Sequence, residues 1–185
     1  MSWKVDNAHT SLEFSARHMM VSTVKGHFNE FVGEVDIDPE DLTRSWATAV
    51  IQAKSLDTRE ERRDTHLRSA DFFDVEKFPE ITYRSGKIER RGENRFRVAG
   101  ELTIKGVTRP IELDVEFLGM GTSPYGVKVA GFEASGTLSR KDFDLNWNVA
   151  LETGGWLVGD EIKLRVDAEA NEEVQAEAGA ETATA

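Results

Sequence analysis

The chain has 185 residues, a length that suits one domain with a sizeable core. It contains no cysteine, which excludes a disulfide framework, a thiolate metal site and a cysteine nucleophile. Its formal net charge of -11 repels phosphate backbones and anionic lipid, so we expect no nucleic-acid partner.

The sequence has no pattern of a targeting or membrane segment. The first residues, MSWKVDNAHTSLEF, lack the basic region followed by an apolar region that marks a secretory signal. We therefore expect a cytoplasmic protein, or a periplasmic or secreted one if a signal has been removed. No apolar run is long enough to span a bilayer, so we expect no stable membrane insertion.

Apolar and polar residues alternate over most of the chain, and a period of two is typical of strands with one apolar face. The alternation is clearest near the C-terminus, where Ile162, Leu164 and Val166 are interleaved with charged residues. Turn sequences such as RGEN at 91–94 separate the alternating stretches. In chain order, the predicted strands lie at about 12–16, 31–37, 46–53, 81–88, 96–104, 111–117, 127–138 and 161–170.

One polar stretch, TREERRDTHL, breaks the alternation between the third and fourth predicted strands. Asp57 or Thr58 could cap a helix there, and Glu60 and Glu61 suit its first turn. We therefore predict a short helix over residues 59–68.

About eight consecutive strands with one apolar face each must stack as two sheets or close on themselves. Consecutive hairpins favour closure over a sandwich, which needs crossing connections. Closure at eight strands leaves an interior just wide enough for side chains or one small ligand. The sequence thus predicts an all-β fold: an eight-stranded antiparallel barrel with a short α-helical insertion.

The end of the chain differs from the rest in composition. Residues 171–185 are rich in alanine and glutamate and contain no basic residue, which predicts a disordered acidic tail. A marginal helix over 172–180 is the alternative. The predicted division is therefore a barrel domain over 1–170 and a tail over 171–185.

The sequence lacks the motifs of common catalytic and metal sites. Its four histidines do not have the HExxH spacing of a zinc helix, and we expect them to be hydrogen-bonded near the barrel rims. There is no GxSxG elbow. Gly154 and Gly159 are followed by acidic residues where a phosphate loop requires Lys and Ser or Thr. We assign no catalytic residue, no metal ligand and no cofactor other than a bound lipid.

Five segments, in order and with matching spacing, resemble the YceI family. They include WKVDNAHTSLEFSARH, SLDTREERRDTHLRSADFF, GELTIKGVTRPIEL, GFEASGTLSRKDFDL and VGDEIKLRVDAEA, within 3–35, 55–85, 100–113, 131–145 and 158–170. The resemblance implies an extended, lipocalin-like barrel with a helix beside it, and a long polyisoprenoid bound in an apolar tunnel. One departure is Asp144, where relatives often have glycine, which bears on the local turn and not on the fold.

The resemblance also picks out polar positions, for which two interpretations stay open. In a structural interpretation, Asp64 and His66 hold the helix to the barrel. In a functional one, an arginine or histidine near the mouth meets a polar head group through charge-assisted hydrogen bonds. The matched polar positions are His18, Arg63, Asp64, His66, Thr108, Arg109 and Arg140.

We expect a ligand to contact apolar residues of the interior and polar residues near the mouth, with the helix and Phe72-Phe73 at the entrance. Phenylalanines are more often core residues than ligand contacts, so the same set also fits a packed interior. The predicted ligand contacts are Phe14, His18, Phe28, Phe31, Ile51, Arg63, His66, Phe72, Phe73, Leu102, Ile104, Phe117, Phe132 and Leu138.

Three functions remain open on the sequence. The first is binding of a polyisoprenoid, such as an isoprenoid quinone precursor or a prenyl phosphate, for transport, storage or sequestration. The second is an enzyme acting on a small hydrophobic or isoprenoid substrate, which predicts His, Asp and Arg clustered inside the pocket. The third is a ligand-free structural or stress-related interaction protein with a packed barrel. We also expect a homodimer, because edge strands and an aromatic rim favour a self-complementary contact.

Overall fold

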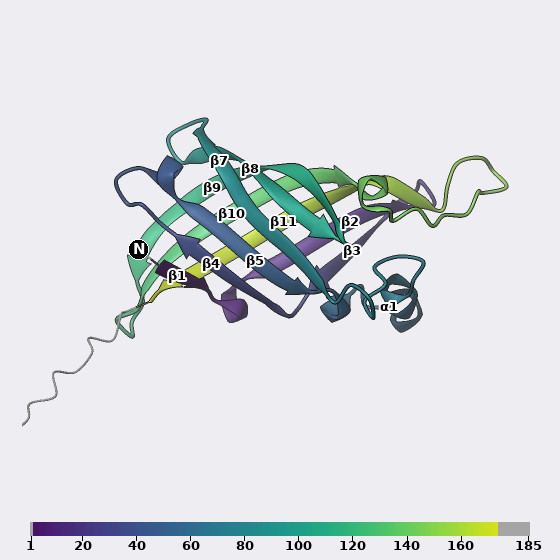
Figure 1. Cartoon of the computed structure of the whole chain (residues 1–185), viewed down its shortest axis with the longest axis horizontal. Helices are drawn as coiled ribbons and strands as arrows, with labels where there is room; N and C mark the ends of the chain where they lie inside the picture. The colour runs from purple at the N-terminus through teal and green to yellow at the C-terminus, as the bar shows by residue number, and fades with distance from the viewer. Residues whose placement is uncertain (1, 174–185) are drawn as a thin grey trace, which may run out of the picture.

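Figure 1 shows the computed structural model of the chain, which describes residues 2–173. Within these residues the chain forms one antiparallel sheet of eleven strand segments and one short α-helix, α1 (Glu61–Arg68). The segments are β1 (Ser2–Val5), β2 (Ser11–His18), β3 (Ser22–Phe28), β4 (Phe31–Asp36), β5 (Trp46–Gln52), β6 (Leu56–Asp57), β7 (Glu80–Arg90), β8 (Arg95–Ile104), β9 (Val107–Thr122), β10 (Lys128–Ser139) and β11 (Val158–Glu172).

Six of the short segments join in pairs, so that the eleven segments make eight long strands. β1 and β2 lie one after the other along β11, where Trp3 pairs with Glu172 and His18 pairs with Val158. In the same way, β3 pairs with β2 and β4 pairs with β1, so that β3 and β4 together form the next long strand. β6 pairs with β3 and β5 pairs with β4, so that β5 and β6 form the one after it. Each of the eight long strands overlaps one of the eight predicted alternating stretches, whereas the segments β1, β3 and β6 were not predicted.

The eight strands close into a barrel. Each strand pairs with the next from β5 through β7, β8, β9 and β10 to β11, and β11 pairs with β1 and β2 at the seam. Figure 1 shows these long, tilted strands winding around one axis. Closure pairs the backbone groups that an open sheet would leave at its edges. The predicted eight-stranded antiparallel barrel is confirmed.

Helix α1 begins two residues later than predicted, and a different residue caps it. The carboxylate of Glu60 accepts hydrogen bonds from the backbone N–H groups of Arg62 and Arg63, at 3.1 and 2.6 Å. The predicted cap, Asp57 or Thr58, is wrong, because Thr58 is instead bonded to Asp64 one turn into the helix. No helix among residues 2–173 is long and apolar enough to cross a membrane.

The last strand runs past the predicted end of the barrel domain. β11 continues to Glu172, where Asn171 and Glu172 still pair with β1. The predicted boundary at residue 170 therefore falls two residues short. The rest of the predicted acidic tail, 174–185, lies outside the described residues.

The two ends of the barrel are built differently. At the end that holds β1, Trp3, Ile37 and Ala170 are each about 1% exposed and pack together with Ala130, which fills the barrel there. At the other end, where Figure 1 places α1, a second core cluster includes Phe72 and residues of several strands. Between these clusters the interior is open, which makes it the site considered below.

Candidate functional site

The barrel encloses a cavity of about 860 Å³. Side chains from all eight long strands line it, and most are aliphatic or aromatic. On β7, for example, Ile81, Tyr83 and Ser85 face inward, while Arg84 between them is exposed on the outer face. The volume falls in the usual range of ligand-binding pockets. The hypothesis of a packed barrel predicted no continuous cavity, and the structure disagrees with it on this point.

The structure brings all the predicted ligand contacts to this one cavity. They come from both halves of the chain and from the region around α1. The cavity is lined by Phe14, His18, Phe28, Phe31, Ile51, Arg63, His66, Phe72, Phe73, Leu102, Ile104, Phe117, Phe132 and Leu138. For the residues on strands, period-two alternation explains this outcome, because residues that alternate on each strand share the inner face of the barrel. Arg63, His66, Phe72 and Phe73 lie on α1 or in the segment after it, so alternation does not explain their placement.

Small inward residues have two different roles in the wall. Ala16 and Ala49 line the cavity and leave space in front of them. Gly100 and Gly136 instead make room for a large neighbour: a Cβ atom at Gly100 would lie 2.9 Å from the Tyr83 hydroxyl, and one at Gly136 would lie 2.7 Å from Cδ2 of Leu113. Only the packing of neighbouring strands distinguishes these two cases.

Aromatic rings cluster at the α1 end of the cavity. His66 on α1 lies edge-on to Phe72 and Trp147, with ring centroids 5.2 and 4.5 Å apart. Phe28 contacts Phe73 edge-on at 5.9 Å. Residues of α1 and the side chains of Phe72 and Phe73 line the cavity, and their role as its entrance stays a prediction. Trp147 also lines the cavity, and the sequence did not predict it because it lies in an irregular segment without periodicity.

The helix is held to the barrel by a buried polar cluster. The carboxylate of Asp64, which is 4% exposed, accepts hydrogen bonds from the backbone N–H and the hydroxyl of Thr58. Arg63 donates from Nε to the Thr58 hydroxyl and from Nη2 to the Thr58 carbonyl, at 2.7 and 2.8 Å. The structural interpretation is therefore right for Asp64, while Arg63 both supports this cluster and borders the cavity.

Arg140 has a structural role at the same end of the barrel. Arg140 is 2% exposed, and its guanidinium donates to the backbone carbonyls of Leu145, Trp147, Val158 and Gly159. Burial lowers its pKa, and Asp160, with Oδ1 at 3.3 Å from Nη2, acts in the opposite direction. These partners occupy the guanidinium donors, so Arg140 holds the 140–159 segment rather than offering a free cation to a ligand.

Two other matched polar positions lie away from the cavity. Thr108 and Arg109 are exposed near the start of β9. The Thr108 hydroxyl is 2.7 Å from that of Thr103, and Arg109 donates to the Thr108 carbonyl. They belong to the outer surface of the β8–β9 hairpin and not to the lining of the cavity.

Tyr83 is one of the polar residues lining the cavity that sequence reasoning missed. Its hydroxyl lies next to Gly100, and among residues 2–173 it has no hydrogen-bond partner. Burial raises the pKa of Tyr83 to about 12, so the hydroxyl keeps its proton at neutral pH. Its neighbour on the same face, Ser85, accepts from the backbone N–H of Ala47 at 2.8 Å. The signal in the sequence was one tyrosine at an inward position of an alternating strand.

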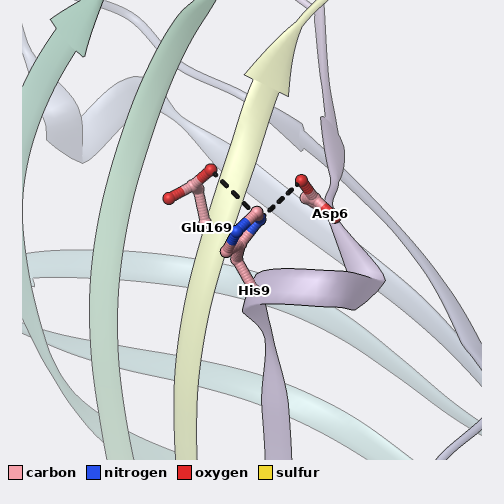
Figure 2. Close-up of side chains that lie close together, drawn as sticks. All are labelled: Asp6, His9 and Glu169. Carbon is pink, nitrogen blue, oxygen red and sulfur yellow. Dashed lines mark hydrogen bonds and ion pairs between the residues drawn. The ribbon is translucent and has the colours of Figure 1, made fainter. Parts of the chain in front are cut away.

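Three of the four histidines have carboxylate partners, near the rims or on the outer face. Figure 2 shows His9 between Asp6 and Glu169: Nδ1 is 3.0 Å from Asp6 Oδ2 and 3.7 Å from Glu169 Oε1. Hydrogen bonding to Asp6, and the negative charges of Asp6 and Glu169, raise the pKa of His9. His27 pairs with Glu13, and His66 with Asp71.

The cluster in Figure 2 has the donor types of a metal site, with all three ligand atoms within 4.8 Å of one another. The sequence pattern could not reveal it, because its members come from opposite ends of the chain. Asp6 already accepts hydrogen bonds from Ala8 N–H and from the Asn171 side chain, and it caps the short helical turn that holds His9. The cluster therefore has a sufficient structural role without an ion.

Residues 3–170 match the family of the YceI-like domain. A UPF0312 protein of Staphylococcus aureus is 43% identical over 165 residues, which cover 89% of this chain and 94% of the relative. The crystal structure of a Campylobacter jejuni YCEI protein matches with a TM-score of 0.73 and 31% identity, over 85% of this chain and 90% of that one.

Two more distant solved structures share the fold. Burkholderia cenocepacia BcnA has a TM-score of 0.76 at 24% identity, over 89% of this chain and 98% of that chain. A domain from Saccharophagus degradans, described as a polyisoprenoid binding domain, has a TM-score of 0.63 at 14% identity, over 92% of this chain and 98% of that chain. With the closed barrel, its helix and its apolar cavity in place, the match over nearly the whole chain shows that this protein belongs to the YceI-like family.

Proposed function

We propose that this protein binds a long apolar ligand, a polyisoprenoid, inside the barrel for transport, storage or sequestration. The observation that carries the proposal is the cavity of about 860 Å³ with its predominantly apolar wall. Burial of apolar surface contributes roughly 2.5 kcal/mol for each 100 Å² removed from water, so a long chain can bind tightly without any charged contact. The description of the Saccharophagus degradans domain as polyisoprenoid binding supports the same ligand class.

The polar groups near α1 fit a binding role better than a catalytic one. The enzyme hypothesis predicts His, Asp and Arg side chains that are available inside the pocket. Asp64 is bonded to Thr58, and the Arg140 guanidinium is bonded to backbone carbonyls, so neither is available to act on a substrate. We therefore propose binding without chemical conversion as the function of this cavity.

Native mass spectrometry of protein purified gently from its own host tests the proposal. The wild-type protein is expected to carry one apolar molecule, identified after extraction as an isoprenoid. Ala134→Trp places a large side chain inside the cavity and is expected to lose the ligand, whereas Ser135→Trp, on the outer face of the same strand, is the matched control and keeps it. Ligand-free wild-type protein that also fails to take up added polyisoprenoid would refute the proposal.

A further inference from the structure

Two neighbouring turns at the α1 end of the barrel carry a cluster of exposed apolar side chains. Of the twelve large hydrophobic residues that are exposed within residues 2–173, five lie on these two turns. Figure 1 shows the longer turn, the yellow-green segment before β11, projecting past the strands at the end opposite the N-terminus. The five residues, called the apolar tip below, are Met19, Met20 and Val21 between β2 and β3, and Val149 and Trp156 before β11.

The two turns touch each other, so the apolar tip is one surface. The backbone N–H of Met19 donates to the carbonyl oxygen of Leu157 at 2.8 Å. Gly155 lies so close to Met20 that a Cβ atom at position 155 would collide with the Met20 sulfur. These contacts hold exposed side chains from distant parts of the sequence together in one patch.

The backbone of the shorter turn is not one that methionine favours. Met19 and Met20 have φ angles of 50° and 63°, in the left-handed region where turns normally use asparagine and glycine. Val21, the next residue, is 80% exposed, and Trp156 on the other turn is 58% exposed. Neither backbone geometry nor packing explains large apolar side chains here, whereas an apolar partner that covers them does.

The apolar tip also lacks the charge that is common in the rest of the chain. Residues 18–22 and 145–157 together contain one Asp, Glu, Lys or Arg residue, Glu152, although 31% of the whole chain is charged. The acidic residues that give the chain its net charge of -11 therefore lie almost entirely elsewhere. The tip itself brings little negative charge to a phospholipid surface, so it can approach one without strong repulsion.

The apolar tip is continuous with the wall of the cavity. Arg17, His18 and Leu157 adjoin the two turns and line the cavity. At the opposite end, Trp3 and Ile37 fill the barrel, so a ligand that moves along the barrel axis passes the end that carries the tip. A long isoprenoid dissolves in a bilayer rather than in water, because water would meet apolar surface along its whole length. The tip therefore lies where such a ligand would be exchanged with a membrane.

We propose that the apolar tip docks reversibly on a phospholipid bilayer, with Met20, Val21 and Trp156 at the boundary between head groups and acyl chains. Tryptophan is enriched at this boundary because its ring is apolar and its N–H is polar. Docking in this way rests on the proposed function and adds a membrane partner to it. A second copy of the chain fits the tip less well, because a stable protein interface typically uses roughly 20 to 30 residues on each side.

Sedimentation with sucrose-loaded vesicles of dioleoylphosphatidylcholine tests the docking. Trp156→Glu places a charge in the apolar tip. Tyr125→Glu is the matched control, because Tyr125 is an aromatic residue, 92% exposed, on the β9–β10 turn at the β1 end of the barrel. We expect the wild type and Tyr125→Glu to bind equally well, and high salt not to release them. Trp156→Glu should weaken the partition coefficient by about tenfold or more, the effect of one large apolar side chain.

Two further variants separate docking from damage to the fold. Val21→Glu, at an exposed position of the other turn, should weaken vesicle binding in the same direction. Trp156→Phe should still dock, but phosphatidylcholine with brominated acyl chains should quench its fluorescence much less than that of the wild type. Trp3 cannot replace this signal, because it is 1% exposed at the opposite end of the barrel. All variants should unfold at about the wild-type temperature, since the changed side chains are exposed.

The contrary results are distinguishable from one another. Wild-type protein that ignores the vesicles but takes up the polyprenol solanesol from ethanol would overturn the docking and leave the proposed function standing. Vesicle binding that Trp156→Glu weakens, without any uptake of solanesol, would support the docking and refute the proposed function. Equal vesicle binding by Trp156→Glu, Val21→Glu and the wild type would show that the apolar tip is not the docking surface. A dimer that Trp156→Glu dissociates, with no vesicle binding, would assign the tip to self-association instead.

Discussion

Truncation of two phenylalanines distinguishes a hollow barrel from a packed one. Phe143 is 2% exposed in the core cluster at the α1 end and does not line the cavity. Phe117 is partly buried, packs against Phe132 at 5.4 Å between ring centroids and faces the cavity. In a packed barrel the two truncations would cost the same free energy, whereas in a hollow one they should differ.

The expected loss in the free energy of unfolding depends on the space that each truncated ring leaves. Phe143→Ala removes a buried ring and creates a new void, so the free energy of unfolding should fall by about 3 to 5 kcal/mol. Phe117→Ala enlarges a space that already exists, so the term for a new void is largely absent. Because the Phe117 ring is only partly buried, the remaining transfer term is about 1 to 2 kcal/mol.

The assay is equilibrium unfolding in guanidinium chloride on ligand-free protein, with the slope of the transition compared between variants. Thermal unfolding gives an independent measure, because 1 kcal/mol shifts the Tm of a domain of this size by about 2 to 4 °C. Added polyisoprenoid should stabilise the wild type through mass action, and it should stabilise Phe117→Ala less. A loss of 3 kcal/mol or more for Phe117→Ala would refute the hollow interior.

Three further predictions concern polar groups and backbone geometry. Asp64→Ala leaves the Thr58 donors without their acceptor and should cost roughly 1.5 to 3 kcal/mol in chemical unfolding; an unchanged midpoint would contradict the role given to this cluster. Asp144 has φ of 57°, so Asp144→Gly should relieve left-handed strain and stabilise the protein by up to about 1 kcal/mol, and destabilisation would argue against that backbone geometry. The pKa of His9 should lie above its ordinary value of about 6.5 by NMR titration, and Asp6→Asn should lower it. Because that pKa is raised, the His9 interaction stabilises the fold fully below about pH 6.5 and is lost as the pH rises through the folded-state pKa.

Local pattern explains why most strands could be predicted, although β1, β3 and β6 lie outside the predicted stretches. Alternation on β11, as at Ile162 and Leu164, identifies both the strand and its inner face from neighbouring residues alone. Helix caps were harder, because Asp57, Thr58 and Glu60 are all chemically able to cap. In the folded protein Thr58 is bonded to Asp64 instead, so Thr58 does not cap the helix.

The candidate site likewise contains residues that the sequence predicts and residues whose surroundings it does not. Inward positions such as Phe14 and Leu102 follow from periodicity, and they line the cavity as expected. The surroundings of Arg140 and Tyr83 do not follow from periodicity. Arg140 donates to four carbonyls from a segment further along the chain, and the Tyr83 hydroxyl has no hydrogen-bond partner among residues 2–173. The hydrogen-bond partners of such side chains depend on which strands and loops lie next to one another in the folded barrel.

The sequence by itself determined most of the strands and their inner faces, because each depends on a period of two that near neighbours specify. It favoured closure over a sandwich, and the pairing of β11 with β1 and β2 in the tertiary structure decided it. The sequence also determined that the interior would be apolar. Only the tertiary structure decided that the interior is hollow, because the space inside a barrel depends on whether side chains from opposite strands reach one another. Gly100 and Ala49 are both small residues at inward positions, but the Tyr83 side chain fills the space beside Gly100, whereas Ala49 lines the cavity.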